Sequence, residues 1–252
     1  MSDNKEFFEL LKTVINEQSF ALELAPGKDP GIVACKQLTT KQLKELVKTV
    51  IDSPVTQSAF NSTCSVIFKE SLIHPPKQPL NVLDRLLFLL QLRINSISPT
   101  VGEFNVKQVA ATLLQKIKEN CSALVPASAS EDKIKITFGI PLIDVELQLN
   151  EEVYKNYNPN LDTSDPEELR VLLGETFVHE IAKSLQTISV EEKTLDLVSV
   201  SFEDRLIAVE TLPASLIQKV VEYIEHYKQI INDGLTVDGN ILTIDASLFS
   251  VR

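Results

Sequence analysis

The histidines are the side chains most able to bind a metal or move a proton, and the chain has only three of them. The segment from His179 to Lys183 reads His-Glu-Ile-Ala-Lys, and it begins like the HExxH motif of zinc proteases. That motif needs two histidines one helical turn apart, and Lys183 stands where the second one is required. Because one zinc ligand is missing, we do not expect a zinc site here. The sequence favours a surface histidine beside an acidic neighbour.

Cysteine chemistry is equally unsupported. Cys35, Cys64 and Cys121 are an odd number at wide spacing and form no CxxC pair, so neither a disulfide framework nor a zinc knuckle is indicated. Cys64 could act as a nucleophile only with a histidine beside it in space. His74 lies in a proline-rich loop and His226 on a polar helix face, and neither has a partner at a recognised spacing. We expect buried free thiols.

Familiar ligand-binding patterns are absent as well. Glycine is scarce, and the sequence contains neither GxGxxG nor GxxxxGK[ST], so phosphate-cradling loops are not expected. The acidic residues Asp144, Glu146, Glu151 and Glu152 lack the alternating order and central glycine of an EF-hand, and we interpret them as a solvated strand face. Tryptophan is absent, and no basic patch is interleaved with aromatic residues, which disfavours nucleic-acid binding. The sequence therefore predicts no catalytic, cofactor-binding or metal-binding residues and a protein that is not an enzyme.

The most informative structural segment is 80–97, LNVLDRLLFLLQLRINSI. Leu, Val, Ile and Phe fill 11 of its 18 positions and run around nearly the whole helix. Such a helix is either a membrane span or the buried centre of a domain. Asp84, Arg85 and Arg93 would each cost roughly 2.5–3.5 kcal/mol near the middle of a bilayer. We therefore expect a central core helix, with its charges at the rim or in an interface, and no membrane partner.

The rest of the chain predicts an α+β fold that is mainly helical, with a small antiparallel β component. Apolar periodicity predicts helices at 4–18, 39–51, 60–73, 105–120, 165–184, 201–211 and 213–234. Alternation predicts strands at 20–24, 32–35, 134–149 with a kink at 139–141, and 195–200, and a hairpin turn at 237–241. In the helix over 165–184, we expect Leu169, Leu172, Leu173, Phe177 and Ile181 to face inward.

The small-residue connector 126–130 is the best internal boundary. It predicts a mainly helical part over 1–125, with a β-hairpin near 20–35, and an acidic α+β part over 131–252; one continuous domain is the alternative. Residues 1–130 carry 14 Lys and Arg against 12 Asp and Glu, a net charge of +2, whereas 131–252 carry 10 against 23, a net charge of −13. This acidity either serves solubility or allows one face to dock a basic partner.

The order of these segments resembles a known family. FALELAPGK at 20–28 is followed by a return strand and helix, then by the leucine-rich helix with Leu86–Arg93, a β segment KITFGIPLIDVELQL at 135–149, and a late Leu-Pro helix leading to a Phe-containing end. This order resembles the baseplate hub subunits and hub-assembly proteins of T-even-like contractile-tailed bacteriophages. The strongest local match is Leu86–Arg93.

The resemblance implies a non-enzymatic structural or assembly protein of the tail baseplate. Its partners would be other baseplate or tail proteins, and it would lie in the virion or act in the host cytoplasm during tail assembly. The opening MSDNKEFFELLK lacks the features of a secretory signal, which agrees with a cytoplasmic site of synthesis. Two alternatives remain open: a small cytoplasmic enzyme that uses Cys64 or an acidic pair, and a cellular adaptor protein.

The charge division generates a first prediction. If the acidic part docks a basic partner, changing Glu151, Glu152, Glu191 and Glu192 to Lys should weaken binding to tail proteins without unfolding the chain. Binding should also weaken as salt rises, because exposed charges are screened beyond about 8 Å at physiological ionic strength. The readout is affinity across a salt series, with an equal number of reversals in the near-neutral part as the control. Indifference to both salt and the reversals would show that the acidity serves only solubility.

Overall fold

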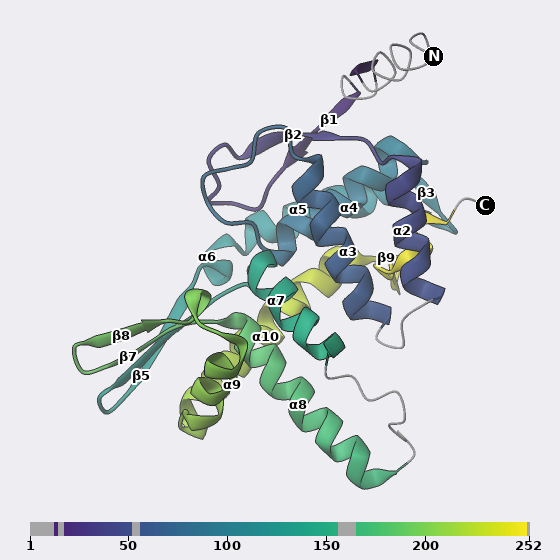
Figure 1. Cartoon of the computed structure of the whole chain (residues 1–252). Helices are drawn as coiled ribbons and strands as arrows, with labels where there is room; N and C mark the ends of the chain where they lie inside the picture. Colours follow the sequence, from purple (N-terminus) through teal and green to yellow (C-terminus); the bar gives the residue numbers. More distant parts are fainter. Residues whose placement is uncertain (1–12, 15–17, 52–55, 156–164, 251–252) are drawn as a thin grey trace, which may run out of the picture. The chain divides into compact units, whose positions relative to one another are not determined.

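The computed structural model describes residues 13–14, 18–51, 56–155 and 165–250 (Figure 1). The described chain is mainly helical with small antiparallel sheets, which confirms the predicted α+β class. It forms two compact units. Unit 1 comprises 1–79, 83–118 and 234–252, and unit 2 comprises 80–82 and 119–233.

Unit 1 contains the central helix α4 (Val82–Ser96). Its other elements are β1 (Ser19–Glu23), β2 (Ile32–Lys36), α2 (Thr40–Ile51), α3 (Thr56–Ser71), β3 (Thr100–Val101), β4 (Phe104–Asn105) and α5 (Val106–Glu119). The α4 side chains that are almost fully buried are Leu83, Leu87, Phe88, Leu89, Leu90 and Leu92. The ring of Phe88 stacks on Phe68 of α3 and on Phe20 of β1, with centroids 4.5 and 6.3 Å apart. The predicted core helix is confirmed, and among the described residues no helix is long and apolar enough to cross a bilayer.

The charges of α4 lie in the interior of unit 1, so the prediction that they lie at the rim or in an interface is wrong. Asp84 is 0% exposed, and Arg85 and Arg93 are also buried. The two oxygens of the Asp84 carboxylate meet the β1–β2 turn: one accepts a hydrogen bond from the backbone NH of Ala25 at 2.9 Å, and the other lies 3.3 Å from Lys28 Nζ. Lys28 also donates to the carbonyl of Pro79. A buried carboxylate thereby fixes the hairpin against α4.

The two arginines of α4 reach other distant segments. Arg85 donates to Ser65 Oγ of α3 at 2.8 Å. Arg93 donates to the carbonyl of Ser250 at 2.9 Å and to the carbonyl of Thr100 at 2.8 Å. These bonds satisfy groups that would be costly to bury alone, and they join the end of the described chain to α4 and to the β3–β4 hairpin.

Unit 2 is built on a four-stranded antiparallel sheet in the order β5 (Ala127–Glu131), β6 (Ile134–Phe138), β7 (Leu185–Val190) and β8 (Lys193–Asp196). Its helices are α6 (Cys121–Leu124), α7 (Ile143–Lys155), α8 (Pro166–Ser184), α9 (Phe202–Thr211) and most of α10 (Ala214–Leu235), with a 3₁₀ turn η1 (Leu197–Ser199). The sheet packs against α10 in part through Phe138 of β6, whose ring meets Tyr223 edge-on at 5.5 Å.

Two strand predictions in this unit need correction. Residues 143–149 form the first half of α7, although Ile143, Val145, Leu147 and Leu149 alternate in the sequence. The buried face of the helix includes the polar residues Glu146 and Asn150 as well as Ile143 and Leu149. Because polar residues interrupt this face, the apolar residues alone do not show a helical period. The predicted strand 195–200 is correct only at its start, because β8 ends at Asp196 and Leu197–Ser199 form η1. The connector at 126–130 is largely strand β5, and strand β7, which pairs with β6, was not predicted.

The C-terminal segment returns to unit 1. After α10 come β9 (Thr236–Val237), β10 (Asn240–Ile241) and the 3₁₀ turn η2 (Ala246–Phe249). Asp238 and Gly239 both have positive φ, which confirms the predicted hairpin turn. Phe249 is buried near Phe60 of α3, with ring centroids 6.4 Å apart. The units therefore differ from the predicted parts 1–125 and 131–252, because buried apolar contacts bring 234–252 back to the N-terminal unit.

Gly234, the last residue of the predicted helix 213–234, lies inside the observed helix. Helix α10 continues through it to Leu235 rather than ending there. A Cβ atom at Gly234 would lie 2.6 Å from Leu113 Cδ1 and 2.8 Å from the Leu113 Cα of α5. The glycine is needed because the two helices approach closely at this point.

The packing of α4 generates a prediction for stability. Leu89 is 1% exposed, so Leu89→Ala should reduce the free energy of unfolding by about 2–5 kcal/mol through lost burial and a residual cavity. Val66→Ala on α3, where Val66 is 45% exposed, is the control and should change stability little. Denaturant unfolding of both variants measures the difference. A Leu89 variant as stable as the parent would exclude a core role for this helix.

Candidate functional site

The His179–Lys183 segment lies on α8 and forms an ion-pair cluster. Lys183 Nζ lies 2.7 Å from one oxygen of Glu180, and Lys228 Nζ of α10 lies 2.9 Å from the other. Burial by itself raises the pKa of the Glu180 carboxyl, but the two ammonium groups outweigh it and hold the pKa at about 2. The glutamate of the incomplete zinc motif is thus charged at neutral pH and clamps α8 to α10 through Lys228.

His179 is partly buried beside this clamp. Its ring lies 5.6 Å from the ring of Phe202 of α9. Burial, followed by the positive charge of Lys183, lowers the pKa of His179. The imidazole therefore packs, half buried, against an aromatic ring, whereas we predicted a surface histidine beside an acidic neighbour; the neighbour Glu180 is present.

The cysteines do not form a reactive site. Cys64 is 0% exposed, so a substrate could not reach its thiol without opening the core. Cys35 is buried too, and its burial raises the pKa of the thiol to about 12, which keeps it protonated. Both match the expected buried thiols, whereas Cys121 is exposed and does not. His74 and His226 are exposed.

The acidic cluster is also placed differently from the prediction. Asp144, Glu146, Glu151 and Glu152 belong to helix α7 instead of a strand. Asp144 and Glu151 are exposed, but Glu146 is buried, so the four do not form one solvated face. Glu146 lies near Tyr227 of α10. The pKa of Tyr227 is raised mainly because the side chain is buried, and the negative charges of Glu180 and Glu146 raise it further. Within the described ranges, no group of three or more His, Cys, Asp or Glu side chains is placed to hold a metal ion.

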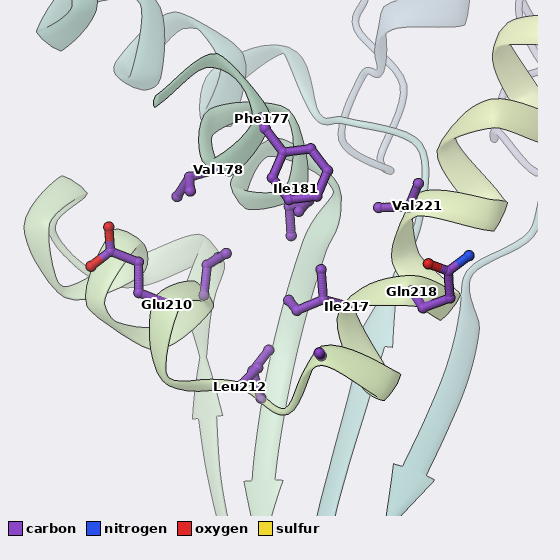
Figure 2. A pocket seen from close by; sticks show the side chains of 10 residues that line it. Phe177, Val178, Ile181, Glu210, Leu212, Ile217, Gln218 and Val221 are labelled. Carbon is purple, nitrogen blue, oxygen red and sulfur yellow. The ribbon is translucent and has the colours of Figure 1, made fainter. Parts of the chain in front are cut away.

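The described part of unit 2 has an apolar groove of about 450 Å³ between α8, α9 and the start of α10 (Figure 2). We call it the α8–α10 groove. It is lined by Phe177, Val178, Ile181, Val209, Glu210, Leu212, Ala214, Ile217, Gln218 and Val221. Phe177 and Ile181 project from α8 toward Ile217 of α10, whereas the polar ends of Glu210 and Gln218 lie at opposite sides of the groove. The centre of the groove is therefore apolar and its rim is polar.

The floor of the groove is fixed, but part of its wall is exposed. Ile181 and Val209 are buried, whereas Phe177 is 50% exposed. The prediction that Phe177 faces inward is therefore wrong. The side-chain burial of Leu169, Leu172 and Leu173 lies outside the described residues, so only the last two members of the predicted stripe can be compared. A half-exposed phenyl ring beside other apolar side chains is typical of a binding surface.

Buried polar contacts hold the helices that form the groove. Arg205 of α9 is fully buried and donates to the carbonyl of Ala182 at 3.0 Å and to the carbonyl of Leu197. The first of these carbonyls belongs to the last turn of α8, where the helix leaves its carbonyl groups unpaired. Arg205 thereby joins α9 to α8, and the Glu180 clamp joins α8 to α10. Sequence reasoning missed the role of Arg205, because an isolated arginine usually lies at the surface.

Unit 2 is also the acidic part of the chain. It contains 9 Lys and Arg against 22 Asp and Glu, a net charge of −13, whereas unit 1 has a net charge of +2. The groove thus lies in a strongly negative unit.

The chain matches no protein-family model, no curated protein and no solved structure.

A second hollow, of about 780 Å³, lies in unit 1 between the β3–β4 and β9–β10 hairpins. Its lining comes from the strands and turns of both hairpins and mixes the apolar residues Val101, Phe104, Val237, Ile241 and Leu242 with polar ones that include Glu103 and Asp238. This lining is mixed in polarity, whereas all the residues that line the α8–α10 groove except Glu210 and Gln218 are apolar. We therefore take the groove as the candidate functional site.

The Glu180 clamp generates a prediction with a defined pH dependence. The folded-state pKa of Glu180, about 2, lies below its ordinary value of 4.5, so the stabilisation is present above pH 4.5 and is lost as the pH falls toward 2. Glu180→Gln should therefore destabilise the protein at pH 7, and the difference from the parent should shrink over that window. Denaturant unfolding at several pH values measures it. Glu222→Gln, which removes a pair with Lys219 at the surface, is the control and should have little effect. A constant difference down to pH 2 would contradict the ion-pair explanation.

Proposed function

We propose that this protein is a non-enzymatic structural or assembly protein of the hub of a contractile bacteriophage tail baseplate. It acts through protein–protein contacts, either in the virion or in the host cytoplasm during tail assembly. Its partners are other baseplate or tail proteins, and it needs no cofactor for this role.

The observation that carries the proposal is the α8–α10 groove. An exposed apolar surface with a polar rim is a recurrent feature of protein-binding sites. A site for a polar metabolite would instead direct several polar groups into its centre. Here the two polar side chains among the lining residues, Glu210 and Gln218, point away from the centre (Figure 2). The groove thus suits apolar side chains of another protein better than a metabolite.

The resemblance to hub proteins supports the phage context. It rests on the order of elements and most strongly on Leu86–Arg93, which lies in the core helix α4. Two side chains that could have taken part in catalysis are not available for it. Cys64 is buried, and the Glu180 carboxylate is paired with two lysines. These observations favour binding over an enzymatic use of Cys64.

The groove generates a prediction for partner binding. Phe177→Glu places a charge in the apolar centre and should weaken binding to the baseplate proteins of the same phage by about tenfold or more, as expected for a central aromatic contact. Ile207→Glu is the matched control, because Ile207 is 60% exposed on α9 and does not line the groove. Co-expression followed by affinity purification and titration of the recovered pair provides the measurement.

Circular dichroism should show that both variants remain folded, since both side chains are substantially exposed. Two results would reject the proposal. One is that no baseplate or tail protein of the same phage binds the parent chain. The other is that the Phe177 and Ile207 variants bind such a partner equally well.

A further inference from the structure

We propose that the α8–α10 groove receives an amphipathic α-helix of a partner protein, with apolar residues on one face and Lys or Arg along one edge. This inference rests on the proposed protein-binding function and deepens it, because it specifies the shape and the charge of the segment that is bound.

The walls of the groove favour a helical segment over an extended one. All three walls come from helices or the turn that joins α9 to α10, and the backbone groups in a helix interior are already bonded to each other. An extended peptide would bring unpaired backbone groups and find no strand edge to satisfy them. A helix satisfies its own backbone and can present side chains at i, i+3, i+4 and i+7 to an apolar groove.

The apolar centre sets the first requirement on that helix. Phe177, Ile181 and Ile217 converge there from α8 and α10, and Val221 lies farther along α10 (Figure 2). Burial of Leu-sized or Phe-sized side chains among these residues would remove the exposed half of Phe177 from water. The partner face must therefore be apolar along about two helical turns.

The rim sets the second requirement. Glu210 is exposed, and its carboxylate has no ion-pair or hydrogen-bond partner among the residues that the structure describes. This differs from Glu180 and Glu222, whose carboxylates are engaged by lysines. Glu210 can thus pair with a cation of the partner, and the net charge of −13 on unit 2 favours approach of a basic segment. The same charge disfavours a second copy of unit 2 as the occupant.

The test uses the full chain and a fluorescent peptide of about 18 residues, long enough for five helical turns. The peptide is built of Leu and Lys with Leu at i, i+3, i+4 and i+7. One comparison peptide has the same composition in scrambled order, and another carries Glu in place of Lys. Fluorescence anisotropy should show that the ordered Leu–Lys peptide binds at least about tenfold more tightly than either comparison peptide.

Substitutions in the protein then locate the site. Phe177→Glu should weaken binding of the ordered peptide by about tenfold or more, whereas Ile207→Glu should change the affinity by less than about twofold. Glu210→Lys should weaken the Leu–Lys peptide and strengthen the Leu–Glu peptide. Glu192→Lys, which makes the same charge change in the exposed β7–β8 turn, should alter both peptides less. If Phe177→Glu perturbs folding, Phe177→Ala serves the same purpose.

Several results would overturn the inference. These are equal binding of the scrambled peptide, equal binding by the Phe177 and Ile207 variants, no effect specific to Glu210, or self-association of the chain that Phe177→Glu abolishes. A tail protein that binds through the groove while the ordered peptide does not would defeat the inference and leave the proposed function intact. Groove-dependent peptide binding without any tail-protein partner would defeat the proposed function and leave the inference intact.

Discussion

The burial of charge inside an apolar helix is the constraint on which unit 1 depends. Asp84, Arg85 and Arg93 lie in the interior beside the leucines of α4. Such groups are tolerated only where specific partners replace water, and removal of one partner of a buried ion pair costs about 3–5 kcal/mol. Because the partners come from the β1–β2 turn, from α3 and from the C-terminal segment, α4 can be buried only when these distant segments occupy their native positions.

In unit 2, buried or partly buried polar contacts likewise join distant segments, and here these segments are the helices around the groove. Arg205 joins α9 to the end of α8, and Glu180 joins α8 to α10 through Lys228. The helices are therefore positioned by polar contacts beneath and beside the groove, and the apolar side chains at its mouth are not required to close it. Phe177 is half exposed on helices that these polar contacts hold together. A preformed apolar groove of this kind loses little conformational entropy when a partner binds.

Local patterns were sufficient where one period dominated. The leucines of 80–97 predicted α4, and Asp238 and Gly239 predicted the β9–β10 turn. Both predictions were correct because the neighbouring residues favour the same local structure. The same reasoning failed at α7, where buried Glu146 and Asn150 interrupted the apolar face, and at Phe177, which faces the groove. It also could not find Arg205 as the tie between α8 and α9, or the approach of Leu113 to Gly234, because both depend on residues far apart in the sequence. Tertiary contacts, not local preference, decide these positions.

Hydrogen–deuterium exchange of the full chain, with and without the ordered Leu–Lys peptide, tests the central claim most directly. The exchange rate of each amide reports how readily its part of the structure opens. In the free chain, the amides of α4 should be the slowest in unit 1. Added peptide should slow exchange in α8, α9 and the first turns of α10, and leave α4 and the β9–β10 hairpin unchanged. Protection confined to unit 1, or absent from all three helices of the groove, would contradict the assignment of the α8–α10 groove as the binding site.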